Sequence, residues 1–135
     1  MTTKNMAYDN ATYVARNGAA LGEAGGGATT QYAKFCAFTS LLAYAAQMTV
    51  TVAGTSAAHG FSIQKISGTA TTALGTATLG TSVAGVTTNL LLTSVAGGVA
   101  LAQGDVLVAV SLADAAGKAA IAYEYNPAPL ANVTL

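Results

Sequence analysis

The residue types that carry most enzyme chemistry are scarce in this chain. One histidine (His59) and one cysteine (Cys36) accompany five scattered carboxylates, at Asp9, Glu23, Asp105, Asp114 and Glu124. A Ser-His-Asp arrangement would have to use His59, but the sequence has no Gly-x-Ser-x-Gly turn. Cys36 would need His59 beside it to act as a nucleophile. We therefore expect His59 to be a non-catalytic loop residue and Cys36 to be a small buried residue of a strand.

The same residues provide no recognisable ligand set. A single histidine, a single cysteine and dispersed carboxylates lack the spacing of zinc or calcium sites. The glycines at 25–27 lack the Lys-Ser/Thr ending of a phosphate-binding loop. Acid–base catalysis would require two carboxylates to converge, whereas Asp105 after Gly104 and Asp114 before Ala-Ala-Gly are typical of turns. The sequence predicts no enzyme activity, catalytic residue, cofactor or metal site.

Tyr123 and Tyr125 offer one alternative to a purely structural interpretation. Two tyrosines at a spacing of two lie on one face of a predicted strand. They could form an aromatic platform for a carbohydrate. Packing in a core or an interface is the interpretation that we favour.

Charge is the most unusual property of the composition. Only 7% of the 135 residues are charged, against about 25% in an ordinary soluble domain. Five Lys and Arg residues balance five Asp and Glu residues, and the basic residues are dispersed. Phosphate binding requires clustered basic side chains, so we expect no nucleic-acid partner.

Residues 66–104 contain no charged side chain at all. Thr and Gly interrupt every apolar run well before the roughly 18 residues that a membrane span needs. The segment is also too rich in Leu and Val for a solvated linker. We expect this surface to be covered by other protein and not by a membrane.

Strand signals dominate the rest of the chain. Alternation with a period of two predicts strands in 30–39, 47–53, 61–67, 106–112 and 119–125, and the turns on either side of 86–92 predict another strand there. In 106–112 this alternation places Val106, Val108, Val110 and Leu112 on one face. Segment 40–46 is either a turn of helix or the start of the next strand. The pentapeptide Thr-Ser-Val-Ala-Gly at 81–85 and 93–97 predicts two turns around one strand.

Residues 1–28 form a separate predicted segment. Four glycines between positions 22 and 27 give a flexible N-terminal arm, with a short strand expected at 11–15. Residues 29–135 then form one all-β domain, a β-sandwich or jelly roll of about seven or eight antiparallel strands. Thr and Ala on the outward faces leave strand edges and sheet faces without the usual charged protection.

The sequence resembles small capsid decoration (cement) proteins of tailed bacteriophages over about residues 29–135. The similarity lies in the segments 61–66, 68–81, 89–94, 101–108 and 114–125, and its character is the richness in Ala, Thr and Gly together with the Gly104-Asp105 pair at the start of a late strand. The family has no catalytic residues to transfer. The resemblance implies a jelly-roll or sandwich subunit, a dimer or trimer, seated on the outer surface of an icosahedral virion shell.

By this resemblance the partner is the major capsid protein, and the N-terminal arm lies across neighbouring capsid subunits. Two other functions remain open at this point. One is a head-fibre or tail structural module of a phage, because such modules share the Gly-Asp feature. The other is a trimeric β-sandwich that binds a carbohydrate or a receptor.

Overall fold

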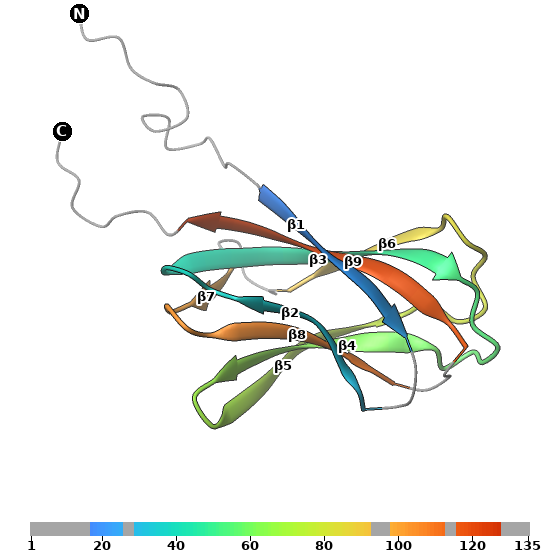
Figure 1. Cartoon of the computed structure of the whole chain (residues 1–135), viewed down its shortest axis with the longest axis horizontal. Coiled ribbons are helices and arrows are strands. Elements are labelled where there is room, and N and C mark those ends of the chain that lie inside the picture. The colour runs from blue at the N-terminus through green and yellow to red at the C-terminus, as the bar shows by residue number, and fades with distance from the viewer. Residues whose placement is uncertain (1–16, 26–28, 93–97, 113–115, 128–135) are drawn as a thin grey trace, which may run out of the picture.

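The computed structural model describes residues 17–25, 29–92, 98–112 and 116–127, and these form two antiparallel β-sheets without any helix (Figure 1). One sheet, sheet A, contains in order β1 (Asn17–Gly25), β9 (Lys118–Pro127), β3 (Leu41–Val52) and β6 (Thr87–Leu91), with β7 (Val99–Leu101) also paired to β3. The other, sheet B, contains in order β2 (Gln31–Cys36), β8 (Val106–Ser111), β4 (Gly60–Ser67) and β5 (Ala70–Thr78). The predicted all-β class is confirmed.

The two sheets enclose a common apolar core in a sandwich-like arrangement. Sheet A contributes alternate residues of its central strands, such as Met48 and Ile121, which are directly paired. Sheet B contributes Phe61, Ile63 and Leu107, and all three are fully buried. The period of two predicted for these strands is therefore the pattern that fills the core.

Segment 40–46 is the start of a strand, which was one of its two predicted alternatives. β3 runs without interruption through twelve residues and pairs with β9 along almost its full length. A register shift between Ala43 and Ala45 accommodates one extra residue near its start. Among the described residues, no helix has the length and apolarity needed to cross a membrane.

β6 and β7 lie along the same edge of β3. Register pairs join β6 to Ala45–Thr49 and β7 to Leu41–Ala43. Between them, the backbone N–H of Leu92 donates to the carbonyl oxygen of Tyr44 at 2.8 Å, which continues the ladder past β6. The first Thr-Ser-Val-Ala-Gly copy lies between β5 and β6 as predicted, whereas the second lies outside the described residues.

The sheet begins earlier than the predicted boundary at residue 28. β1 lies within the segment assigned to an N-terminal arm, and it pairs with β9 from Asn17 to Gly25. Gly22 has a φ of +90° between the two halves of β1, where the register shifts. A glycine accepts this conformation readily, so part of the Gly-rich run serves a bulge in a strand. The strand expected at 11–15 lies outside the described residues.

Candidate docking surface

The outer side of sheet B carries a row of apolar side chains that point away from the core. Strand register pairs Val106, Val108 and Val110 of β8 with Ile66, Gln64 and Ser62 of β4, respectively. The intervening residues of β8, Leu107 and Ala109, belong to the core between the sheets. We call the outer side of sheet B, centred on Val106, Val108, Val110 and Ile66, the valine face.

The valine face is densely packed although it lies outside the core. Val108 is fully buried, and Val106, Val110 and Ile66 are half-buried. Leu112 follows the end of β8 in the same alternation and is 37% exposed. The predicted grouping of the three β8 valines on one face is confirmed by their register. β8 is thus apolar on both faces, a pattern typical of a strand covered on both sides.

The positions that the register assigns to the valine face carry no charge. The two charged residues in the strands of sheet B are Lys34 and Lys65. Lys34 is exposed in the edge strand β2, where the register with β8 shifts, and its neighbours Ala33 and Phe35 pack on the core, so Lys34 flanks the valine face. Lys65 pairs with the core residue Leu107 and its ammonium group reaches β7 of sheet A. The flanking positions on β5 include the exposed residues Ala73 and Thr76.

The outer side of sheet A is polar by comparison. Its cross-strand rows contain Gln47 beside Asn89, and Thr49 beside Thr87, whose hydroxyl oxygens are 2.9 Å apart. Glu124 and Lys118 also lie in strands of this sheet, as does the exposed Glu23. The two outer sides therefore differ in chemistry, and the valine face is the one suited to contact with an apolar protein surface.

The strand edges are less open than the sequence suggested. Three outer strands, β1, β2 and β5, each have a register shift in their pairing with the neighbouring strand. The fourth edge is divided between two short strands, β6 and β7. Bulges and short edge strands both oppose strand addition. Among the described strands, the faces are therefore better candidates for association than the edges.

One end of the molecule also exposes apolar side chains. Val52, Val83 and Val86 are 43%, 67% and 40% exposed, respectively. Hydrogen bonds of Val50 with Gly85 and Val86 hold the loop after β5 beside the end of β3. Leu112 lies at the same end of the sandwich, because its N–H donates to the carbonyl of Gly60 at the start of β4. This end adjoins one end of the valine face.

His59 lies in the predicted loop, immediately before β4, but its side chain is fully buried. Its ring contacts Phe61 edge-on, with centroids 5.6 Å apart. Neither ring nitrogen has a hydrogen-bond partner among the described residues. A general base needs a hydrogen bond to its nucleophile, and the structure shows no such bond to Ser56 or Ser62.

The prediction that Cys36 is buried is wrong. Its side chain is exposed at the end of β2, because Cys36 pairs with Val106 on the outer side of sheet B. His59 precedes the start of β4, where Phe61 pairs with Ser111 at the opposite end of β8. Cys36 and His59 are therefore at opposite ends of sheet B and cannot form a nucleophile–base pair.

The three described carboxylates do not come together. Glu23 pairs with Ala120 and Glu124 with Ala45, four positions apart along β9, while Asp105 lies in the turn before β8. Asp9 and Asp114 lie outside the described residues. Within the described ranges, no group of three or more His, Cys, Asp or Glu side chains is placed to bind a metal ion.

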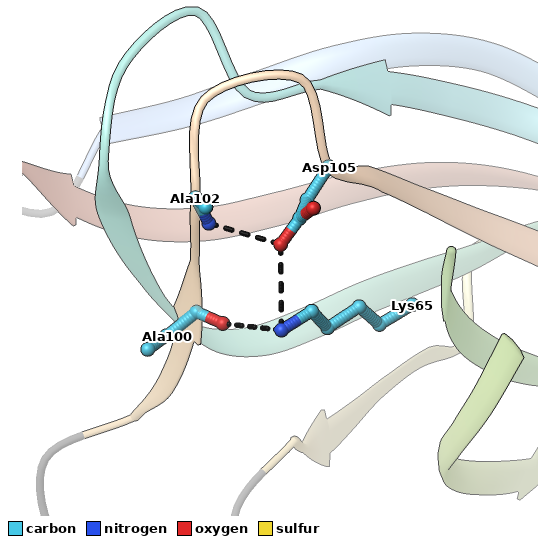
Figure 2. Close-up of polar contacts among 4 residues, drawn as sticks. All are labelled: Lys65, Ala100, Ala102 and Asp105. Atoms are coloured by element: carbon cyan, nitrogen blue, oxygen red, sulfur yellow. Dashed lines mark hydrogen bonds and ion pairs between the residues drawn. The ribbon is translucent and has the colours of Figure 1, made fainter. Parts of the chain in front are cut away.

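Asp105 instead belongs to a contact between the two sheets (Figure 2). Its Oδ2 accepts a hydrogen bond from the backbone N–H of Ala102 at 2.9 Å and lies 3.4 Å from Nζ of Lys65. The same ammonium donates to the carbonyl of Ala100 in β7 at 2.9 Å. The Ala102 N–H, followed by the Ser67 hydroxyl and Lys65, holds the pKa of Asp105 below its usual value, although burial opposes this. Asp105 follows a turn, as predicted, but its carboxylate accepts from the N–H three residues before it and not two residues after it as in an Asx turn.

The two tyrosines pack as the favoured interpretation predicted. Tyr123 is fully buried, and its hydroxyl donates to the carbonyl of Ala33 at 2.9 Å. Burial raises the pKa of the Tyr123 phenol. Tyr125 stacks on Phe35 with centroids 5.1 Å apart and meets Phe38 edge-on. Because Tyr123 is enclosed in the core, the two tyrosines do not form an exposed pair, although Phe38 at the edge of this aromatic cluster is 62% exposed.

No protein-family description, curated protein or solved structure matches this chain.

Proposed function

We propose that this protein is a capsid decoration protein that binds the outer surface of an assembled phage shell and bridges its major capsid proteins. The observation that carries the proposal is the apolar valine face, with Val106, Val108 and Val110 directed away from the core. An apolar face of this kind gains free energy when a second protein covers it. The function is structural, and it requires no catalytic residue and no cofactor.

The strand order also supports the jelly-roll form of the sandwich. If β6 and β7 are counted as one interrupted strand, each sheet has four strands. Successive strands from β1 to β4 then alternate between the two sheets, and β5 pairs with β4 within sheet B. The chain alternates again from β5 through the β6–β7 strand, β8 and β9. This winding is the one expected of an eight-stranded jelly roll with two Greek keys.

The proposed mechanism is mass action. A protein that binds the assembled shell, and not the loose subunits, shifts the equilibrium toward assembly by its binding free energy. Covering about 1,000 Å² of apolar surface at about 25 cal/mol/Å² gives a gross hydrophobic free energy of binding of about 25 kcal/mol. The loss of translational and rotational freedom and the ordering of side chains cancel most of this free energy. A remaining few kcal/mol per copy, repeated over the lattice, would still stabilise the shell.

The test compares shells with and without the bound protein. Shells assembled from the major capsid protein of the source phage should melt at a higher temperature when this protein is bound, as measured by calorimetry. Two matched variants then examine the face. Ala73→Lys places a cation beside the valine face, whereas Ala120→Lys places one on the outer side of sheet A. Both alanines are exposed in the isolated subunit.

We expect the Ala73→Lys protein to lose both binding and shell stabilisation, because docking would bury an unpaired ammonium. The Ala120→Lys protein should behave like the wild type. Equal melting temperatures for bare and treated shells would exclude the decoration function. Shell stabilisation that survives Ala73→Lys but not Ala120→Lys would assign docking to the other face.

A further inference from the structure

His59 lies where three connecting segments meet at one end of the sandwich. Its backbone carbonyl accepts hydrogen bonds from the N–H groups of Leu79 and Gly80, at 2.8 and 2.9 Å, which join the loop before β4 to the segment after β5. Its ring adjoins the segment before β9, because a Cβ atom at Gly117 would lie 2.4 Å from a ring carbon. A Cβ atom at Gly54 would lie 2.8 Å from Nδ1. The backbone and the ring of one residue therefore hold this end together.

The buried ring has no partner for a positive charge among the described residues. The His59 side chain is 1% exposed, and neither ring nitrogen makes a hydrogen bond within the described ranges. A cation–π contact with Phe61, whose ring centroid is 5.6 Å away, offsets only a small part of the cost of burying an unpaired charge. A neutral imidazole can occupy this site, whereas an imidazolium is strongly disfavoured there.

The elements around the ring supply no carboxylate in the part of the chain that the structure describes. The loops after β3 and after β5 belong to the stretches 35–64 and 66–104, in which the histidine is the only acidic or basic residue. The ammonium of Lys65, in β4, reaches β7 at the opposite end of the sandwich. Lys118, at the start of β9, is exposed and has the wrong sign to stabilise an imidazolium. Asp114 lies outside the described residues.

We propose that His59 is an acid-sensitive switch that opens this end of the sandwich when its ring takes up a proton. An exposed histidine titrates near pH 6.5, so below about this pH protonation favours states in which the ring reaches water. Outward movement of the ring would break the bonds of its backbone to Leu79 and Gly80 and release the loop that carries the exposed Val83 and Val86. The proposal does not depend on docking through the valine face.

Amide hydrogen exchange tests whether acid opens this end alone. Between pH 7 and pH 5.5, the protection factors of the Leu79 and Gly80 amides should fall about tenfold, because opening is coupled to the uptake of one proton. The Gly104 amide, which donates to the Ala37 carbonyl at 2.8 Å at the opposite end, is the control and should keep its protection. Equal loss at Gly104, or no loss at Leu79 and Gly80, would overturn the proposal.

The ring itself can be followed in the wild-type protein, because His59 is the only histidine in the sequence. In the closed protein, its ring nitrogens should keep the NMR chemical shifts of a neutral imidazole down to pH 5.5. Protonation of the ring while the Leu79 and Gly80 amides stay protected would exclude the switch, since the closed site would then accept the charge. This measurement needs no variant and so does not depend on whether a substituted protein folds.

Two variants assign the acid response to the ring. His59→Leu removes the titrating group, and its Leu79 and Gly80 protection factors should change less than about twofold over the same pH range. Asp114→Asn removes the carboxylate of the segment before β9 and should respond to acid like the wild type. A tenfold loss of protection that persists in His59→Leu would contradict the proposal. An altered acid response of Asp114→Asn would do the same, because it would identify a partner for the imidazolium.

Discussion

The Nζ atom of Lys65 lies 3.4 Å from Oδ2 of Asp105, forty positions later in the chain. Lys65 belongs to β4 of sheet B, and its ammonium also donates to the carbonyl of Ala100 in β7 of sheet A. One side chain therefore connects the two layers at the end where the turn before β8 lies (Figure 2). Its side chain is 25% exposed and that of Asp105 is 8% exposed, so solvent screens the pair only in part.

Lys65→Met should lower the free energy of unfolding by about 1–2 kcal/mol. The substitution keeps most of the aliphatic volume but removes the ammonium from the Asp105 carboxylate, which is 8% exposed, together with the hydrogen bond to Ala100. Urea unfolding followed by circular dichroism measures the change. Lys118→Met, at an exposed position of β9, is the control and should stay close to the wild type. Equal stability of the two variants would contradict a role for the Lys65 contact.

Asp105 should make stability depend on acidic pH. Its pKa is lowered in the folded protein, first by the Ala102 N–H, so the unfolded chain binds the proton more readily. The stabilisation is therefore complete above the usual pKa of about 3.9 and is lost as the pH falls through the lower folded value. The stability difference between wild type and Asp105→Asn should shrink as the pH falls below about 4. A difference that stays constant down to pH 2 would contradict this contribution.

Tyr123 should ionise only after the protein unfolds. Burial raises its pKa, so its stabilising contribution is present below about pH 10 and is lost as the pH rises further. In the folded protein, the wild type and Tyr123→Phe should therefore show the same phenolate absorbance near pH 10. After unfolding, the wild type should show one additional titrating group. An absorbance difference while both proteins are folded would mean that the Tyr123 phenol reaches solvent.

The same substitution should also reduce stability at neutral pH. Tyr123→Phe leaves the carbonyl of Ala33 without its donor, at a cost of about 1 kcal/mol. Tyr125→Phe is a suitable control, because Tyr125 is only half-buried and would keep its ring contacts with Phe35 and Phe38. Urea unfolding at pH 7 compares the two. A larger loss for Tyr125→Phe would contradict the assignment.

Gly117→Ala should destabilise the fold by about 1–3 kcal/mol. A Cβ atom at position 117 would lie 2.4 Å from a ring carbon of His59, and the rigid imidazole is fully buried. In a His59→Ala background the same substitution should cost much less, because the obstructing ring is gone. Thermal unfolding of the four proteins gives the coupling. Additive losses would mean that the His59 ring does not determine the requirement for glycine.

Strands with one apolar face could be predicted from the sequence, and strands without that contrast could not. The alternation in 61–67 and 119–125 corresponds to β4 and β9, because polar residues mark the side that leaves the core. β5 was not predicted, since Thr, Ala and Gly at 70–78 give no apolar face. β1 was assigned to an arm for the same reason, and its pairing with β9 is a tertiary interaction.

The candidate docking surface could likewise be predicted only in part. The sequence placed Val106, Val108 and Val110 on one face but did not determine whether that face points inward. Leu107 and Ala109 are also apolar, and only packing against sheet A selects them for the core.

The sequence by itself determined the all-β class, the low charge and the positions of most strands, because composition and a period of two are local properties of a chain. The tertiary structure decided which face of β8 is outward, where Cys36 lies and which residues meet across strands. Lys65 contacts Asp105 because a turn and a sheet bring distant positions together. Local alternation has no means of encoding such a pairing.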